Sequence, residues 1–71
     1  MTVRKTTQLV HEGQYAAEVE VGLIEDEDGW SPYLSLQDAQ KLDEVREALR
    51  RGDLTRAGHF SRVFRLMPVA R

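Results

Sequence analysis

The feature that most constrains this chain is an alternation of apolar and polar residues over positions 14–24. Every second residue in this stretch is apolar, namely Tyr15, Ala17, Val19, Val21 and Leu23. Successive side chains of a strand point to opposite faces of a sheet, so a period of two over this length indicates a half-buried strand. One face of this strand is expected to meet a core and the other to meet water.

Another strand, with a weaker sequence pattern, is predicted before residues 14–24. Residues 3–11 carry β-branched residues at several positions. Glu12-Gly13 then offers a two-residue hairpin turn, because glycine adopts positive φ at no steric cost. Pairing around that turn would set Lys5 opposite Glu20 on the solvent face, where opposite charges attract.

A helix is predicted over about residues 35–51. Ser35 is a good N-cap, and Asp38 three residues later completes a pattern like a capping box near the positive end of the helix dipole. Apolar residues recur at helical spacing, at Ala39, Leu42, Val45 and Leu49, with Ala48 at the edge of this stripe. Gly52 is expected to end the helix, and a short second helix follows over about 53–60.

The C-terminal part is more ambiguous. Residues 60–67 fit either a continued helix or a strand, and their β-branched and aromatic residues favour a strand over about 62–67 that Pro68 ends. Residues 30–34 fit a short edge strand, because Pro32 has no N–H for a sheet ladder.

These elements predict a single small α+β domain over residues 1–71. Its architecture would be a small three- or four-stranded antiparallel sheet with the main helix packed on one face. A domain of this size buries only about 60% of the surface of its unfolded chain. A protein partner or a second copy would therefore add to its stability.

Composition indicates the cellular compartment in which the protein is expected. The chain has no cysteine, which excludes disulfides and thiolate chemistry and fits a reducing cytosol. No apolar run follows the basic pair Arg4-Lys5, and no stretch approaches the ~20 apolar residues of a membrane span. We therefore expect a cytoplasmic protein with no membrane partner.

Charge is divided unevenly along the chain. Residues 1–45 carry three basic and ten acidic residues, whereas residues 46–71 carry seven arginines and two acidic residues. Either the arginines pair with the acidic half within the fold, or the division marks interaction surfaces. The acidic surface that would dock a basic protein partner consists of Glu25, Asp26, Glu27 and Asp28. The basic surface that would bind nucleic-acid phosphates consists of Arg50, Arg51, Arg56 and Arg62.

No catalytic or metal-binding constellation is visible. The only histidines are His11 and His59, and a metal site or a catalytic triad needs more convergent groups. Phe60 and Phe64 lie among the arginines and would suit base stacking, but core positions are the favoured interpretation. We expect no enzyme activity, no cofactor and no metal.

Two short motifs precede the predicted helix, namely Tyr15-Ala16-Ala17-Glu18-Val19-Glu20 and Glu27-Asp28-Gly29-Trp30, and the capped helix then starts at Ser35-Leu36-Gln37-Asp38-Ala39. Together these three segments resemble the N-terminal domain of HicB-like antitoxins. The resemblance covers residues 14–49 and implies a small sheet with a helix behind it, in a non-enzymatic protein that masks a small basic ribonuclease toxin. The chain departs from that family at Ser31-Pro32-Tyr33-Leu34, where the family has a loop rich in proline and glycine, and no separate DNA-binding tail follows.

The sequence therefore predicts a non-catalytic protein-binding module, antitoxin-like in the HicB sense, that docks a basic partner or a second copy. The alternative is a small nucleic-acid-binding module that uses the C-terminal arginines.

Overall fold

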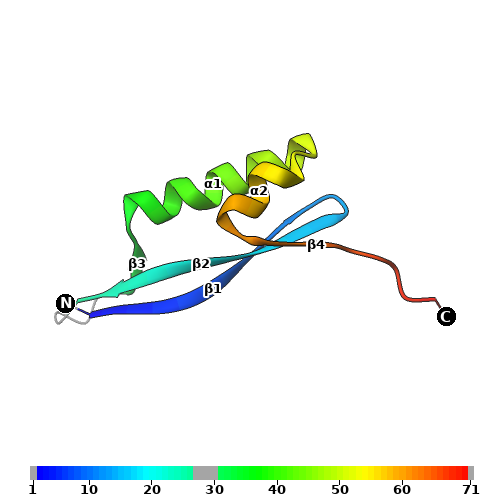
Figure 1. Cartoon of the computed structure of the whole chain (residues 1–71). Helices are drawn as coiled ribbons and strands as arrows, with labels where there is room; N and C mark the ends of the chain where they lie inside the picture. Colours follow the sequence, from blue (N-terminus) through cyan, green and yellow to red (C-terminus); the bar gives the residue numbers. More distant parts are fainter. Residues whose placement is uncertain (1, 27–30, 71) are drawn as a thin grey trace.

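The computed structural model describes residues 2–26 and 31–70. It has the predicted α+β architecture, with a four-stranded antiparallel sheet, one main helix and a short second helix (Figure 1). In chain order the elements are β1 (Thr2–Glu12), β2 (Tyr15–Glu25), β3 (Tyr33–Leu34), α1 (Leu36–Arg51), α2 (Leu54–Phe60) and β4 (Arg62–Arg65).

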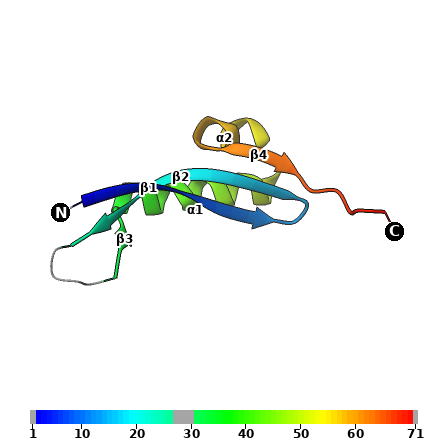
Figure 2. The same cartoon turned by 90° about the horizontal axis from the view of Figure 1, so that it is seen from below.

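β2 is the centre of the sheet. On one side it pairs with β1 along its whole length. On the other side it pairs with β3 at Leu23 and Ile24 and with β4 from Tyr15 to Glu18. Figure 2 shows that α1 lies behind the sheet and that α2 lies beside β4. No described helix covers the second face of the sheet, and β1 forms one long edge.

The hairpin register corrects the prediction from sequence. The turn is Gly13-Gln14 and not Glu12-Gly13, so that Glu12 pairs with Tyr15. Gly13 has φ +60°, and the described non-glycine residues all avoid positive φ. A turn at Glu12-Gly13 would put a glutamate at the first central position, where the favoured hairpin turns require positive φ. Lys5 therefore faces Gly22 and reaches Glu20 diagonally, in an ion pair of 3.4 Å.

The ends of both helices follow their predicted local signals. The Ser35 hydroxyl accepts a hydrogen bond of 3.1 Å from the Asp38 N–H at the start of α1. Gly52 ends α1 with φ +76°, in the left-handed region that favours glycine. The Asp53 carboxylate then caps α2 by accepting from the Arg56 N–H at 3.1 Å.

The C-terminal segment is a strand, as predicted, but a shorter one. β4 ends at Arg65, and the Leu66 N–H still donates to the Gln14 carbonyl at 2.7 Å. Gln14 lies in the hairpin turn, so a longer β4 would run past the end of β2 and find no partner strand. Residues 66–70 accordingly extend beyond the hairpin (Figures 1 and 2).

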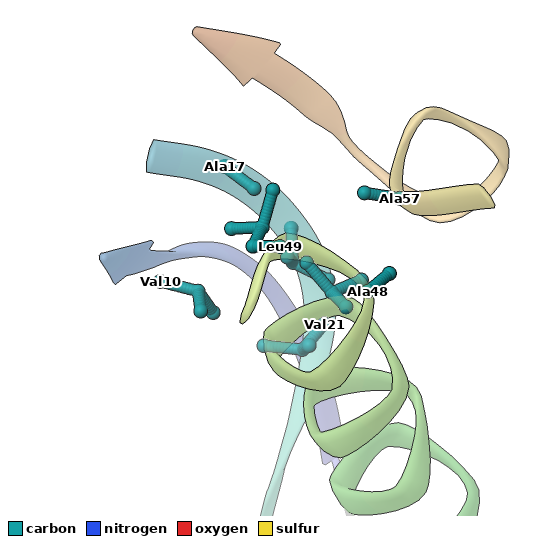
Figure 3. Packing of buried hydrophobic residues seen from close by; sticks show 8 residues of the cluster. Val10, Ala17, Val21, Ala48, Leu49 and Ala57 are labelled. Atoms are coloured by element: carbon teal, nitrogen blue, oxygen red, sulfur yellow. The ribbon is translucent and has the colours of Figure 1, made fainter. Parts of the chain in front are cut away.

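The core lies between α1, α2 and one face of the β1–β2 hairpin (Figure 3). Its buried members are small, namely Val10, Ala17, Val19, Val21, Val45, Ala48, Leu49 and Ala57. Two predicted core residues, Leu42 and Tyr15, are only partly buried at its margin, and Ala48 is fully buried instead of peripheral. A core made largely of alanine and valine buries little apolar surface, so it gives the domain only a small hydrophobic stabilisation.

Candidate functional site

The acidic segment that starts at the last residue of β2 is partly paired with other residues of the same chain. The Glu25 carboxylate pairs with the Arg4 guanidinium at 3.0 Å, and Asp26 also has an interaction partner. Glu27 and Asp28, the other half of the predicted acidic surface, lie outside the described residues. A basic partner would therefore have to compete with Arg4 for Glu25.

The four predicted phosphate-binding arginines are distributed over three elements. Arg50 pairs with Glu12 of β1 at 3.0 Å and with Glu47 at 3.5 Å. The hydrogen bond that Arg50 donates to Glu12, with the charges of Glu12 and Glu47, raises the pKa of Arg50. Arg56 of α2 pairs with Glu44 of α1 at 3.4 Å.

The other two predicted arginines, Arg51 and Arg62, have no ion pair among the described residues. The Arg62 guanidinium lies over the Phe64 ring, 5.1 Å from its centroid. Half of the predicted basic surface is thus already occupied by carboxylates of the same chain.

The aromatic residues among these arginines are less buried than predicted. Phe60 is exposed and lies under Arg56, at 5.9 Å from guanidinium carbon to ring centroid. Phe64 is half-buried and pairs with Ala16 on the uncovered face of the sheet. Neither ring belongs to the core, because α2 presents the small Ala57 to the sheet and β4 presents Val63.

The histidines do not converge on a site. The His11 Nε2 lies 2.8 Å from the Gly13 carbonyl oxygen and braces the hairpin turn. His59 lies on the exposed surface of α2, in an open hollow with Arg56 and Phe60. In the part of the chain that the structure describes, no group of three or more histidine, aspartate or glutamate side chains is placed to hold a metal ion. No described helix has the length and apolar character needed to cross a membrane.

One edge of β2 is closed by side chains of α1. Between β3 and β4, the backbone groups of β2 near Glu20 and Gly22 have no partner strand within the described ranges 2–26 and 31–70. The Asp38 carboxylate accepts from the Gly22 N–H at 2.8 Å, and the Lys41 ammonium donates to the Glu20 carbonyl at 2.7 Å. The Asp38 carboxylate therefore does not return to the N-cap, as in a full capping box, but fastens α1 to the sheet.

The hydrogen bond between the Gly22 N–H and the Asp38 carboxylate can be tested by substitution. Asp38→Ala leaves the Gly22 N–H without its acceptor, and such a loss costs about 1–3 kcal/mol. Thermal melts should show that destabilisation, and hydrogen exchange at the Gly22 amide should become faster. Asp38→Asn should recover part of the loss because its amide oxygen still accepts. Asp43→Ala on the exposed side of α1 is the matched control, and an equal loss there would contradict the assignment.

The opposite edge of the sheet, along β1, is open. Because Gly22 directs its N–H away from β1, the preceding residue, Val21, directs its backbone groups toward β1, where it pairs with Thr6. Backbone direction alternates along a strand, so the residues of β1 whose N–H and C=O point away from β2 are Val3, Lys5, Thr7, Leu9 and His11. Within the described residues, β1 pairs only with β2. A row of backbone donors and acceptors is thus available along the whole strand.

The overall shape leaves much surface uncovered. The chain measures 47 × 30 × 14 Å, and its radius of gyration is 14.3 Å, against about 11 Å for a compact domain of this length. Its accessible surface is 5580 Å², whereas a compact monomer of 8.1 kDa has about 4,500 Å². The excess of about 1,100 Å² exceeds the roughly 800 Å² that each partner contributes to a standard interface.

The fold and its open edge define a small flat α+β domain with one helical layer. Comparison of the chain with protein-family models, with curated proteins and with solved structures returned no match. The function of the chain is therefore inferred from its surfaces.

Proposed function

We propose that this chain is a non-catalytic protein-binding module that docks its partner along the β1 edge. The observation that carries the proposal is the open edge on a molecule with about 1,100 Å² of excess surface. A strand that pairs with β1 gains a ladder of main-chain hydrogen bonds and covers exposed apolar side chains on the same edge. This is binding by strand addition.

Two features of β1 support an edge that accepts a strand. Lysine and arginine on an edge strand commonly prevent pairing, because an incoming strand would bury their charge. Here Arg4 pairs with Glu25 at 3.0 Å and Lys5 pairs with Glu20 at 3.4 Å, so both charges are compensated within the chain. Val3 and Leu9 are 61% and 65% exposed, although their side chains are apolar.

The two other hypotheses from the sequence remain predictions. A basic toxin-like partner at the acidic segment would meet a Glu25 that Arg4 already holds. Nucleic-acid binding would rely mainly on Arg51 and Arg62, because Arg50 and Arg56 have carboxylate partners. By contrast, the outward backbone groups of β1 have no partner strand among the described residues.

The test is affinity capture from the native cell, with the tagged chain as bait. Wild type is compared with Thr7→Pro, and each capture is made with and without nuclease. The Thr7 N–H points away from β2, so proline there blocks an incoming strand and leaves the ladder within the hairpin intact. We expect wild type to retain protein, including untagged copies of the chain, in a nuclease-resistant manner, and Thr7→Pro to lose it. Retention that nuclease abolishes, or equal retention by both chains, would overturn the proposal.

A further inference from the structure

The geometry of β1 points to a second copy of this chain as the strand that pairs with its edge. We infer an antiparallel β1–β1 dimer whose two-fold axis passes beside Thr6. This inference rests on the proposed function and names the partner of the same edge.

Self-complementarity of the strand supports this choice. In an antiparallel pair across the open edge, residues with outward backbone groups must face each other, so odd-numbered residues of β1 face odd-numbered residues of the second copy. Centring the axis on Thr6 sets Val3 opposite Leu9 of the second copy, and Leu9 opposite its Val3. Both exposed apolar side chains of β1 then find an apolar neighbour on the same face.

A shift of the axis by one residue removes this match. An axis at Thr7 would set Val3 opposite His11 and Lys5 opposite Leu9, which pairs each apolar residue with a polar one. The Thr6 register is thus the one in which the exposed apolar residues of the strand face each other.

Charge is also compatible with the Thr6 register. Lys5 would face Thr7 of the second copy and Arg4 would face its Gln8, so no like charges lie directly opposite. Glu20 and Glu25 keep Lys5 and Arg4 compensated within each chain, at 3.4 and 3.0 Å. The pairing therefore adds no directly opposed, uncompensated charge.

The dimer would be one continuous sheet with both helical layers on the same face. Residues that face each other across the edge belong to the same face of the sheet, since odd positions of β1 meet odd positions of the second copy. The uncovered face of the sheet would then run without interruption across both chains. The open edge of β1 becomes an interface, so one aggregation-prone edge of the sheet is closed.

The first experiment measures mass and register on the purified chain. Light scattering should give twice the 8.1 kDa of one chain as concentration rises. A non-hydrogen-bonded antiparallel pair places its Cα atoms about 4.5 Å apart, within disulfide range. Thr6→Cys should therefore form a disulfide-linked dimer under mild oxidation, with no native cysteine to compete.

Gln8→Cys is the matched control on the same strand and face. Gln8 would face Arg4 of the second copy, so the two introduced thiols would lie about 13 Å apart along the strands, beyond disulfide reach. Cross-linking of Thr6→Cys without Gln8→Cys supports the register. Equal cross-linking of both variants, or of neither, overturns it.

A second pair of variants distinguishes a loss of dimerisation from a loss of folding. Leu9→Lys should weaken association at least about tenfold, because it sets a lysine against Val3 of the second copy. Leu36→Lys, at a 74% exposed leucine on α1, should associate like wild type, and at low concentration, where the dimer is dissociated, both variants should melt like the parent. A purified chain that stays monomeric overturns the second-copy inference. If it still captures another protein through β1, the proposed function stands.

Discussion

Leu49→Ala is expected to lower the free energy of unfolding by about 2–5 kcal/mol. The Leu49 side chain is 2% exposed and packs with Val10 and Val45 between α1 and the sheet. Its truncation leaves a cavity in a core made largely of alanine and valine, where few large neighbours can move in to fill it. Small domains have only about 5–15 kcal/mol of stability, so this loss is a large part of the total.

Urea or thermal unfolding followed by circular dichroism measures the effect. Leu36→Ala on the same helix is the matched control, since that leucine is 74% exposed and should change stability by less than about 0.5 kcal/mol. Similar melts for Leu49→Ala and wild type would mean that the α1 stripe is not the core of this domain.

Thr6→Pro is the second large effect, and its neighbour Thr7→Pro supplies the contrast. Thr6 pairs with Val21 and directs its N–H into the β1–β2 ladder. Proline there removes a donor, leaves the Val21 carbonyl unpaired at a cost of about 1–3 kcal/mol, and adds backbone strain. Thr7→Pro should cost clearly less, because the Thr7 N–H faces outward.

The pair of proline variants is compared by chemical denaturation at low protein concentration, where the dimer would be dissociated. Equal losses of stability, or a larger loss for Thr7→Pro, would mean that the assigned direction of the β1 backbone is wrong. That outcome would also remove the basis for strand addition at this edge.

Local signals predicted most of the fold. The alternation around Val19 identified the buried face of β2, and Ser35, Gly52 and Asp53 each mark a helix end in the structure. The hairpin register was not predictable from the pattern, because a slip of two residues leaves every side chain on its original face. The conformation required of Gly13 decides the register.

The proposed site was harder to predict than the fold. The acidic run and the arginines stand out in composition, but their ion pairs, such as Arg50 with Glu12, join residues far apart in the chain. The link between Asp38 and Gly22 likewise has no local sequence signal. Which strand lies at the edge depends on β4 returning to β2, so the open edge of β1 appears only once that long-range pairing is known.

The division of one side of β2 between β3 and β4 has a consequence for the order of assembly. The hairpin of β1 and β2 closes through a two-residue turn and needs only local contacts, whereas β4 must return from residues 62–65 to residues 15–18. During synthesis, the β4 position beside β2 stays empty until residues 62–65 have been made. A growing chain that has not yet reached residues 62–65 would thus expose both edges of the hairpin at this end, and only after β4 has paired with β2 does β1 remain as the open edge.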